Sequence, residues 1–366
     1  MTDKISLKQA NQFLLCAVLI CLVLHFGKEV LIPVTFAVFF AMLFTPLSNR
    51  LEGWGIKRGF TAFISVLILV MATVGIGMLV YMQSKKLAER SEDIEKKSEQ
   101  FMQKAQSYIT SKLSVTQKKQ DEMISKQLKS FMQSSGRLFK DFVTGFAGIV
   151  ATFVIVLIFT FLFLLQRDKY EAFFIKISGT GQNPDETKRV IGQVSKVAQS
   201  YLTGRVISIL IFTTLFTCGF LIISLESAFL LAFIAALLTI VPYVGSIVGG
   251  LFPFAVALVT ADMNVALGAL VVILVVQTLD NYFIEPYIIG GEVNISGFFT
   301  ILILLVGGVM WGVAGMVLFL PMLAVTKIVF DAIPKLKPYA FLIGDQETEK
   351  PSKRLLEKIK KLFKKK

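Results

Sequence analysis

Residues 228–259, AFLLAFIAALLTIVPYVGSIVGGLFPFAVALV, form an uncharged apolar run of 32 residues that is too long for a straight membrane span. As one helix it would measure about 48 Å, whereas the hydrocarbon core of a bilayer is about 30 Å thick. Pro242 and several glycines interrupt its middle. Because proline removes a helical donor and clashes with the preceding turn, the run predicts a broken or re-entrant helix. A long, tilted and kinked helix is the alternative.

A second apolar run, 298–326, has the same form. Its 29 residues would make a helix of about 43 Å, and glycines and a proline again lie inside it. Glycine permits sharp bends and close approach, so we expect the chain to bend at such residues in both runs. The candidate hinges are Gly249, Gly250, Gly307, Gly308, Gly312, Gly315 and Pro321.

The rest of the chain has the composition of a membrane protein. Hydrophobic residues make up 55% and charged residues 17%, against about 45–50% and 25% in soluble domains. Six further apolar runs lie near 12–27, 30–48, 59–82, 142–165, 206–225 and 263–279. The sequence therefore predicts an all-α, polytopic helical membrane protein with six to eight spans. Eight spans, or six spans plus two hairpins, both fit, and they differ in the side on which 280–297 lies.

Lysine and arginine concentrate in the loop 49–58, the segment 166–205 and the C-terminal tail. The positive-inside rule places these basic segments, and therefore both termini, in the cytoplasm. The polar stretch 83–140 has apolar residues at helical spacing, which predicts a helical hairpin outside the cytoplasm. The predicted parts are N-terminal transmembrane helices at 1–82, an extracytoplasmic helical insert at 83–140, a transmembrane transport core at 141–330 containing the cytoplasmic segment 166–205, and a basic cytoplasmic tail at 331–366.

The sequence lacks the residues that several classes of protein require for their function. His25 is the only histidine and the three cysteines are not clustered, so neither a zinc site nor a Ser-His-Asp triad is expected. No GxxxxGK[ST] phosphate loop occurs. The net charge of +13 lies largely beside apolar runs, where a membrane protein carries it. We therefore predict no enzyme, no cofactor, no metal and no nucleic-acid partner.

Polar residues inside the apolar half are few, which makes them candidates for a transport site. A helix break exposes backbone groups that a polar solute or ion can use. The candidate solute contacts are Thr239, Pro242, Tyr243, Gly245, Ser246, Gln277 and Asn281. A carboxylate near a membrane is costly unless it is paired, hydrated or functional, so Asp280 and Glu285 are candidates for ion or proton coupling. The structural alternatives are hydroxyls bonded to their own helix and a polar helix end at the interface.

Four blocks of sequence resemble one known family. They are Tyr201-Leu-Thr-Gly204-Arg205, Pro242-Tyr-Val-Gly245-Ser-Ile-Val-Gly249, Asp280-Asn281-Tyr-Phe-Ile-Glu-Pro286-Tyr-Ile-Ile-Gly290, and Gly307-Gly308 through Gly315 to Pro321. In order and spacing they look like the autoinducer-2 exporter family of PerM-like membrane proteins. The resemblance implies a transporter, since members are described as exporting a small furanosyl signal or exchanging Na⁺ or Li⁺ for H⁺. It also implies a homo-oligomer in the bacterial inner membrane.

The sequence thus predicts a secondary membrane transporter in the lipid bilayer. It would export a small polar solute, or exchange a monovalent cation such as Na⁺ for protons, by alternating access. The absence of an ATP motif favours an ion gradient as the energy source. A passive oligomeric channel and a non-transporting membrane scaffold are the alternatives.

Overall fold

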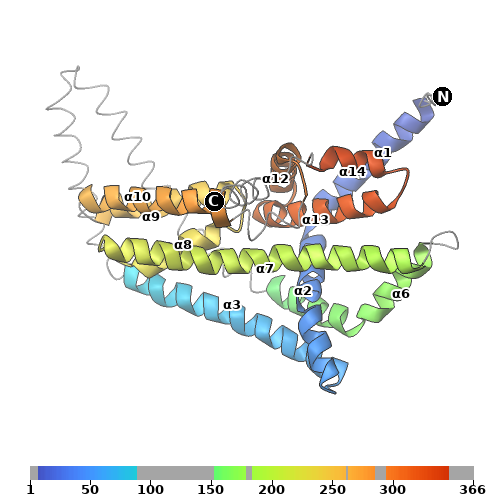
Figure 1. The fold of residues 1–366 in the computed structure, drawn as a ribbon, viewed down its shortest axis with the longest axis horizontal. Coiled ribbons are helices and arrows are strands. Elements are labelled where there is room, and N and C mark those ends of the chain that lie inside the picture. The colour runs from blue at the N-terminus through green and yellow to red at the C-terminus, as the bar shows by residue number, and fades with distance from the viewer. Residues whose placement is uncertain (1–6, 89–151, 179–183, 261–262, 285–293, 346–366) are drawn as a thin grey trace, which may run out of the picture. The chain divides into compact units, whose positions relative to one another are not determined.

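The computed structural model describes residues 7–88, 152–178, 184–260, 263–284 and 294–345. Most of the predicted insert 83–140, Glu285 and the tail from residue 346 lie outside these ranges. Within them every regular element is a helix. The labelled helices in Figure 1 are α1 (Leu7–Phe26), α2 (Lys28–Gly53), α3 (Arg58–Ala88), α6 (Arg167–Ile177), α7 (Pro184–Ile222), α8 (Ala228–Leu238), α9 (Val244–Thr260), α10 (Met263–Leu279), α12 (Gly297–Trp311), α13 (Val313–Ala332) and α14 (Lys337–Ile343).

An apolar helix over Thr152–Leu165 precedes α6, and a π-helical turn, η1 (Asp280–Ile284), continues α10. By length and composition, five of the described helices could cross a membrane: α2, α3, α7, α10 together with η1, and α13. These helices confirm the prediction of an all-α, polytopic membrane protein. The chain therefore sits in a lipid bilayer.

The run 228–259 folds as a helical hairpin. Helix α8 ends at Leu238, the chain unwinds through residues 239–243, and α9 begins at Val244. Tyr243 has a positive φ of 61° in this turn. A Cβ atom added to Gly249 would lie 2.6 Å from the carbonyl oxygen of Ala235, so the two arms pack backbone against backbone. Because the run 228–259 forms two antiparallel helices, the alternative of one long, tilted and kinked helix is wrong.

The run 298–326 is also a hairpin, formed by α12 and α13. The chain turns at Gly312, where φ is 62° and ψ is −140°, a conformation essentially restricted to glycine. A Cβ atom on Gly307 would lie 2.6 Å from the carbonyl oxygen of Gly315, so these arms also touch through their backbones. The indole of Trp311 donates a 2.8 Å hydrogen bond to the carbonyl of Leu24, which ties α12 to α1.

The bends therefore lie at 239–243 and at Gly312. The other candidate hinges lie inside helices, where their small size or ring permits close packing: Gly249, Gly250, Gly307, Gly308, Gly315 and Pro321. The physical reason is that each hairpin needs small residues along both arms, and the same residue types also favour bends.

The chain divides into two compact units. One contains α1, α6 beyond its first residue, α7 up to Tyr201, and α12 to α14. The other contains α2 from Glu29, α3, α7 from Leu202, α8 to α10 and η1. In the second unit, α8 is mostly buried, and Phe212, Phe216 and Phe220 of α7 belong to the same core. The first hairpin is therefore built into the centre of its unit.

Candidate functional site

A small pocket lies inside the second unit, beside the break in the first hairpin. Its volume is about 10 Å³, which is room for about one water molecule. Three parts of the chain line it: α7, the hairpin α8–α9, and the end of α10. The lining residues are Phe212, Phe216, Thr239, Ser246, Gly249, Gly250, Val276, Gln277 and Asp280. The fold thus brings together four polar residues predicted from the sequence, which are Thr239, Ser246, Gln277 and Asp280.

Gln277 joins α10 to the start of α9. Its side-chain amide donates a 2.8 Å hydrogen bond to the carbonyl oxygen of Ser246. A Cβ atom on Gly250 would lie 2.7 Å from the Gln277 amide nitrogen and 2.8 Å from a methyl of Ile273. Glycine at position 250 therefore leaves the space in which the amide reaches α9.

Arg205 joins α7 to the break itself. This residue is 8% exposed, and one guanidinium nitrogen donates a 3.4 Å hydrogen bond to the carbonyl oxygen of Thr239. The Thr239 hydroxyl donates a 2.6 Å bond to the carbonyl of Ala236, as the structural alternative predicted. The break thus presents a backbone acceptor to a buried cation, while the threonine hydroxyl caps the end of α8.

Ser208 lies one turn after Arg205 on α7 and is 2% exposed. Its hydroxyl oxygen has no hydrogen-bond partner among the residues that the structure describes. Buried polar groups are nearly always paired, so an unpaired hydroxyl is an exception. Ser208 precedes Phe212 by four residues, and Phe212 lines the pocket, so both lie on one face of α7.

Sequence reasoning did not select Arg205 or Ser208 as site residues. The partner of Arg205 is a backbone carbonyl, which becomes available only once the run 228–259 folds back. The signal that could have found it is a lone arginine directly before the apolar run 206–225. Buried charged groups within membrane segments are costly and commonly functional.

Asp280 lines the pocket at the first position of η1 and is half-buried. π-Helical turns are rare and frequently lie at functional sites. Asn281 follows on the exposed side of this turn, and Glu285 lies outside the described residues. Of the two carboxylates proposed for coupling, the pocket therefore contains Asp280.

Three further predicted contacts belong to the turn and not to the pocket wall. Pro242 is buried, and it has no N–H with which to continue the hydrogen-bonded turns that follow α8. Tyr243 is 53% exposed. A Cβ atom on Gly245 would collide with the carbonyl of Leu238, so Gly245 allows the tight reversal into α9. These residues shape the break.

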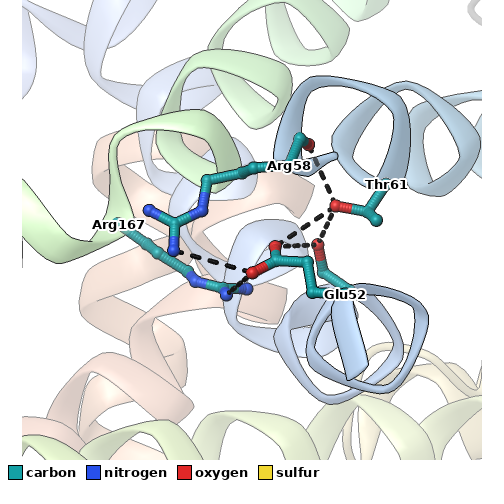
Figure 2. Close-up of polar contacts among 5 residues, drawn as sticks. Glu52, Arg58, Thr61 and Arg167 are labelled. Carbon is teal, nitrogen blue, oxygen red and sulfur yellow. Dashed lines mark hydrogen bonds and ion pairs between the residues drawn. The ribbon is translucent and has the colours of Figure 1, made fainter. Parts of the chain in front are cut away.

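A second polar cluster joins the ends of α2, α3 and the segment that begins α6. Figure 2 shows Arg58 and Arg167 converging on Glu52: the carboxylate lies 2.7 Å from Arg167 and 3.6 Å from Arg58. The fully buried hydroxyls of Ser48 and Thr61 are 2.9 Å apart, and Thr61 donates to Glu52 at 3.3 Å. This Glu52 cluster was not predicted. It holds the loop between α2 and α3 beside the first residue of α6.

A larger pocket of about 490 Å³ lies in the first unit, between the N-terminal half of α7 and the end of α13. Its wall carries both signs of charge, with Glu186 and Asp331 beside Arg189 and Lys196. Asp331 is also paired with Lys327 at 2.9 Å. The mixed rim therefore favours no single class of charged ligand. No group of three potential metal ligands gathers anywhere in the described ranges.

Comparison with known proteins places most of the chain in one family. The family described as AI-2E family transporter matches residues 14–335. YueF of Bacillus subtilis is 29% identical over 217 residues, which are 58% of this chain and 58% of YueF. The AI-2 transport protein TqsA of Escherichia coli is 22% identical over 329 residues, 89% of this chain and 92% of TqsA. YhhT of the same species is 22% identical over 330 residues, 88% of this chain and 90% of YhhT.

Proposed function

The chain belongs to the AI-2E transporter family, and from this premise we propose that it is a secondary transporter that works by alternating access. Its cargo is a small polar solute that it exports, or a monovalent cation that it exchanges for protons. The observation that carries this proposal is the unwound turn 239–243, whose pocket is completed by polar groups from α7 and α10. Such breaks form solute and ion sites in transporters because they expose backbone dipoles.

Two hydrogen bonds hold the broken hairpin in its present position. Arg205 binds the carbonyl of Thr239 from α7, and Gln277 binds the carbonyl of Ser246 from α10. The pocket between them has room for about one water molecule, so this arrangement is a closed state. In the proposed cycle the hairpin moves away from α10, both carbonyls exchange protein donors for solute or water, and the hairpin then closes again.

Asp280 is the proposed coupling group. It lies in the pocket beside Gln277, where a bound cation or proton would neutralise its carboxylate. Ser208 supplies a buried hydroxyl on the α7 face that leads to the pocket. The closed pocket supports a gated transporter over a passive oligomeric channel, whose route would stay open. A non-transporting scaffold would show no flux that depends on an ion gradient, which distinguishes it from the proposed transporter.

The proposed topology has six crossings and two re-entrant hairpins. Each hairpin returns the chain to the side from which it came, so neither long run counts as a crossing. With both termini in the cytoplasm, loop 49–58 and segment 166–205 then share the cytoplasmic side, and the contact between Glu52 and Arg167 supports this arrangement. We further propose that the protein works as a homo-oligomer in the bacterial inner membrane.

The experiment is a flux assay in proteoliposomes that contain the full chain and a trapped pH indicator. Addition of Na⁺ or Li⁺ to acid-loaded vesicles should raise the internal pH if cations exchange for protons. In a parallel assay, AI-2, the ligand named for TqsA, is loaded and its efflux is followed with and without a pH gradient. We expect Asp280→Asn to abolish the dependence on the pH gradient, whereas Glu226→Gln, an exposed carboxylate outside the pocket, should retain it.

Solute flux that ignores the pH gradient in the unmodified protein would contradict coupling and favour the channel. Flux of neither cation nor AI-2 from a correctly assembled protein would contradict the proposed cargo classes. Equal gradient dependence in Asp280→Asn and the unmodified protein would remove Asp280 from the mechanism.

A further inference from the structure

Helix α6 carries a stripe of four bulky apolar side chains, three of which are more than half exposed. The stripe consists of Tyr170, Phe173, Phe174 and Ile177, which follow the spacing i, i+3, i+4 and i+7. Their exposed fractions are 37%, 52%, 53% and 66%, respectively. No residue of α6 is buried. Within the part of the chain that the structure describes, the stripe is therefore a largely open surface.

The charged residues of α6 lie outside the stripe. At about 100° per residue the stripe covers an arc of about 100°, and the remaining circumference holds the charged residues together with Ala172 and the half-buried Ile175. The charged residues are Arg167, Asp168, Lys169, Glu171 and Lys176. Arg167 and Lys169 border the stripe on its two sides. The pattern is that of an amphipathic helix with basic edges.

This helix is too short and too polar to cross a bilayer. Its 11 residues extend about 16 Å, roughly half of the hydrocarbon core. It begins at Arg167, two positions after the apolar helix Thr152–Leu165 ends. A helix that starts where a membrane helix ends lies at the level of the lipid headgroups. An exposed apolar stripe at that level is adjacent to acyl chains.

The Glu52 cluster fixes the first residue of α6 at this level. Glu52 binds Arg167 at the end of α2, and Trp54, two residues after Glu52, is 78% exposed. Tryptophan is enriched where lipid headgroups meet the hydrocarbon core, because its ring is amphipathic. The start of α6 and an exposed tryptophan therefore belong to the same stretch of the interface.

We propose that α6 is an interfacial anchor whose stripe is inserted at the boundary between phospholipid headgroups and acyl chains. Insertion of such a stripe to a depth of about 5–10 Å covers the exposed rings. Lys169 extends along one edge of the helix toward lipid phosphates, with its aliphatic stem against the hydrocarbon, while Arg167 at the other edge stays bound to Glu52. This binding surface is separate from the pocket and does not depend on the proposed transport activity.

Site-directed spin labelling of the full chain in liposomes of phosphatidylethanolamine and phosphatidylglycerol tests the proposal. Cys16, Cys21 and Cys218 are all exposed, so a cysteine-free background can be made without opening the core. Single labels are placed on the stripe through Phe173→Cys, Phe174→Cys or Ile177→Cys. The matched controls on the charged face are Asp168→Cys and Glu171→Cys. Collisions with oxygen report hydrocarbon, and collisions with a water-soluble nickel chelate report water.

We expect the oxygen-to-nickel collision ratio to be several-fold higher at the three stripe positions than at the two controls. If one variant misfolds, as judged by altered elution from a size-exclusion column, the other two stripe labels still test the proposal. Equal ratios on both faces would overturn the proposal, since the stripe would then lie in water. Protection of the stripe labels from both probes would also overturn it, because a protein surface and not lipid would then cover the helix.

Discussion

Arg167 donates a 2.7 Å hydrogen bond from its guanidinium to the carboxylate of Glu52, although 115 positions separate the two residues. Arg58 approaches the same carboxylate, and the buried hydroxyls of Ser48 and Thr61 complete its surroundings. One acidic side chain thus holds the ends of three helical segments together. Arg58 and Arg167 carry positive charge of the kind that predicts membrane topology. They also stabilise the fold by binding the carboxylate of Glu52.

Glu52→Gln should lower the free energy of unfolding by about 1–2 kcal/mol, because two arginines then meet without a counter-charge. The estimate is moderate since the Glu52 and Arg167 side chains remain about one-fifth exposed. Thermal unfolding in detergent measures the change, and a double-mutant cycle with Arg167→Gln isolates the pair. Lys327 and Asp331 are the control pair, because Asp331 is 51% exposed and an i,i+4 pair within one helix should couple by only about 0.3–0.5 kcal/mol. Equal coupling in both pairs would contradict the structural role of Glu52.

Gly249→Ala should destabilise the protein by about 1–3 kcal/mol, the usual cost of overpacking. The added methyl group would press on the carbonyl oxygen of Ala235, which is backbone and cannot rotate away. Gly75→Ala in α3 is the matched control, since nothing lies within 4 Å of its added Cβ. There alanine should be neutral or stabilise by up to about 1 kcal/mol through its helix propensity. Equal unfolding temperatures for the two variants would show that α8 and α9 are not in backbone contact.

Gly312→Ala tests the second turn through backbone strain alone. An added Cβ at position 312 meets nothing within 4 Å, but the residue has φ of 62° and ψ of −140°. We expect a loss of about 1–3 kcal/mol from the strained conformation, measured by thermal unfolding. Gly297→Ala is the control, because it also meets open space and carries no positive φ. A neutral Gly312→Ala would mean that α12 and α13 are joined by a different turn.

The sequence predicted the breaks because length, proline and glycine act locally. A run of 32 apolar residues with Pro242 near its centre cannot remain one straight span, and the turn formed there. The meeting of Thr239, Ser246, Gln277 and Asp280 could also be anticipated, since polar groups in an apolar region gather where they can be satisfied. Their transport roles stay predictions.

Other features depend on partners that local sequence does not reveal. Arg205 binds the backbone carbonyl of Thr239, and every residue has such a carbonyl. The side chains of residues 239–243 therefore do not indicate this contact. Gly249 resembles a hinge in sequence, yet it permits close packing because Ala235 lies opposite it. The pairing of Glu52 with Arg167 required knowledge of how α2 and α6 meet. Each of these three contacts could be identified only from the tertiary structure.

Arg205→Met should release the hairpin from α7 by removing the donor to the Thr239 carbonyl while retaining much of the side-chain volume. A hydrogen bond from a charged group contributes about 1.5–3 kcal/mol, so its loss should shift the closed-to-open equilibrium by about tenfold or more. The proteoliposome assay should then show a reduced dependence on the pH gradient. Arg205→Lys retains a cationic donor and should restore part of this dependence. Coupled flux that is unchanged in Arg205→Met would show that Arg205 does not control the hairpin.

Gln277→Leu tests the second link, between α10 and α9. The leucine keeps the size of the side chain but removes the amide that donates to the Ser246 carbonyl at 2.8 Å. The matched control is the neighbouring Thr278→Val, because the Thr278 hydroxyl is exposed and bonds to the carbonyl of Leu274 in its own helix. If the hairpin closes against α10 through Gln277, the leucine variant loses gradient-coupled flux and the valine variant keeps it. Equal loss in both would trace the effect to disturbance of α10, and equal retention would mean that closure does not use this hydrogen bond.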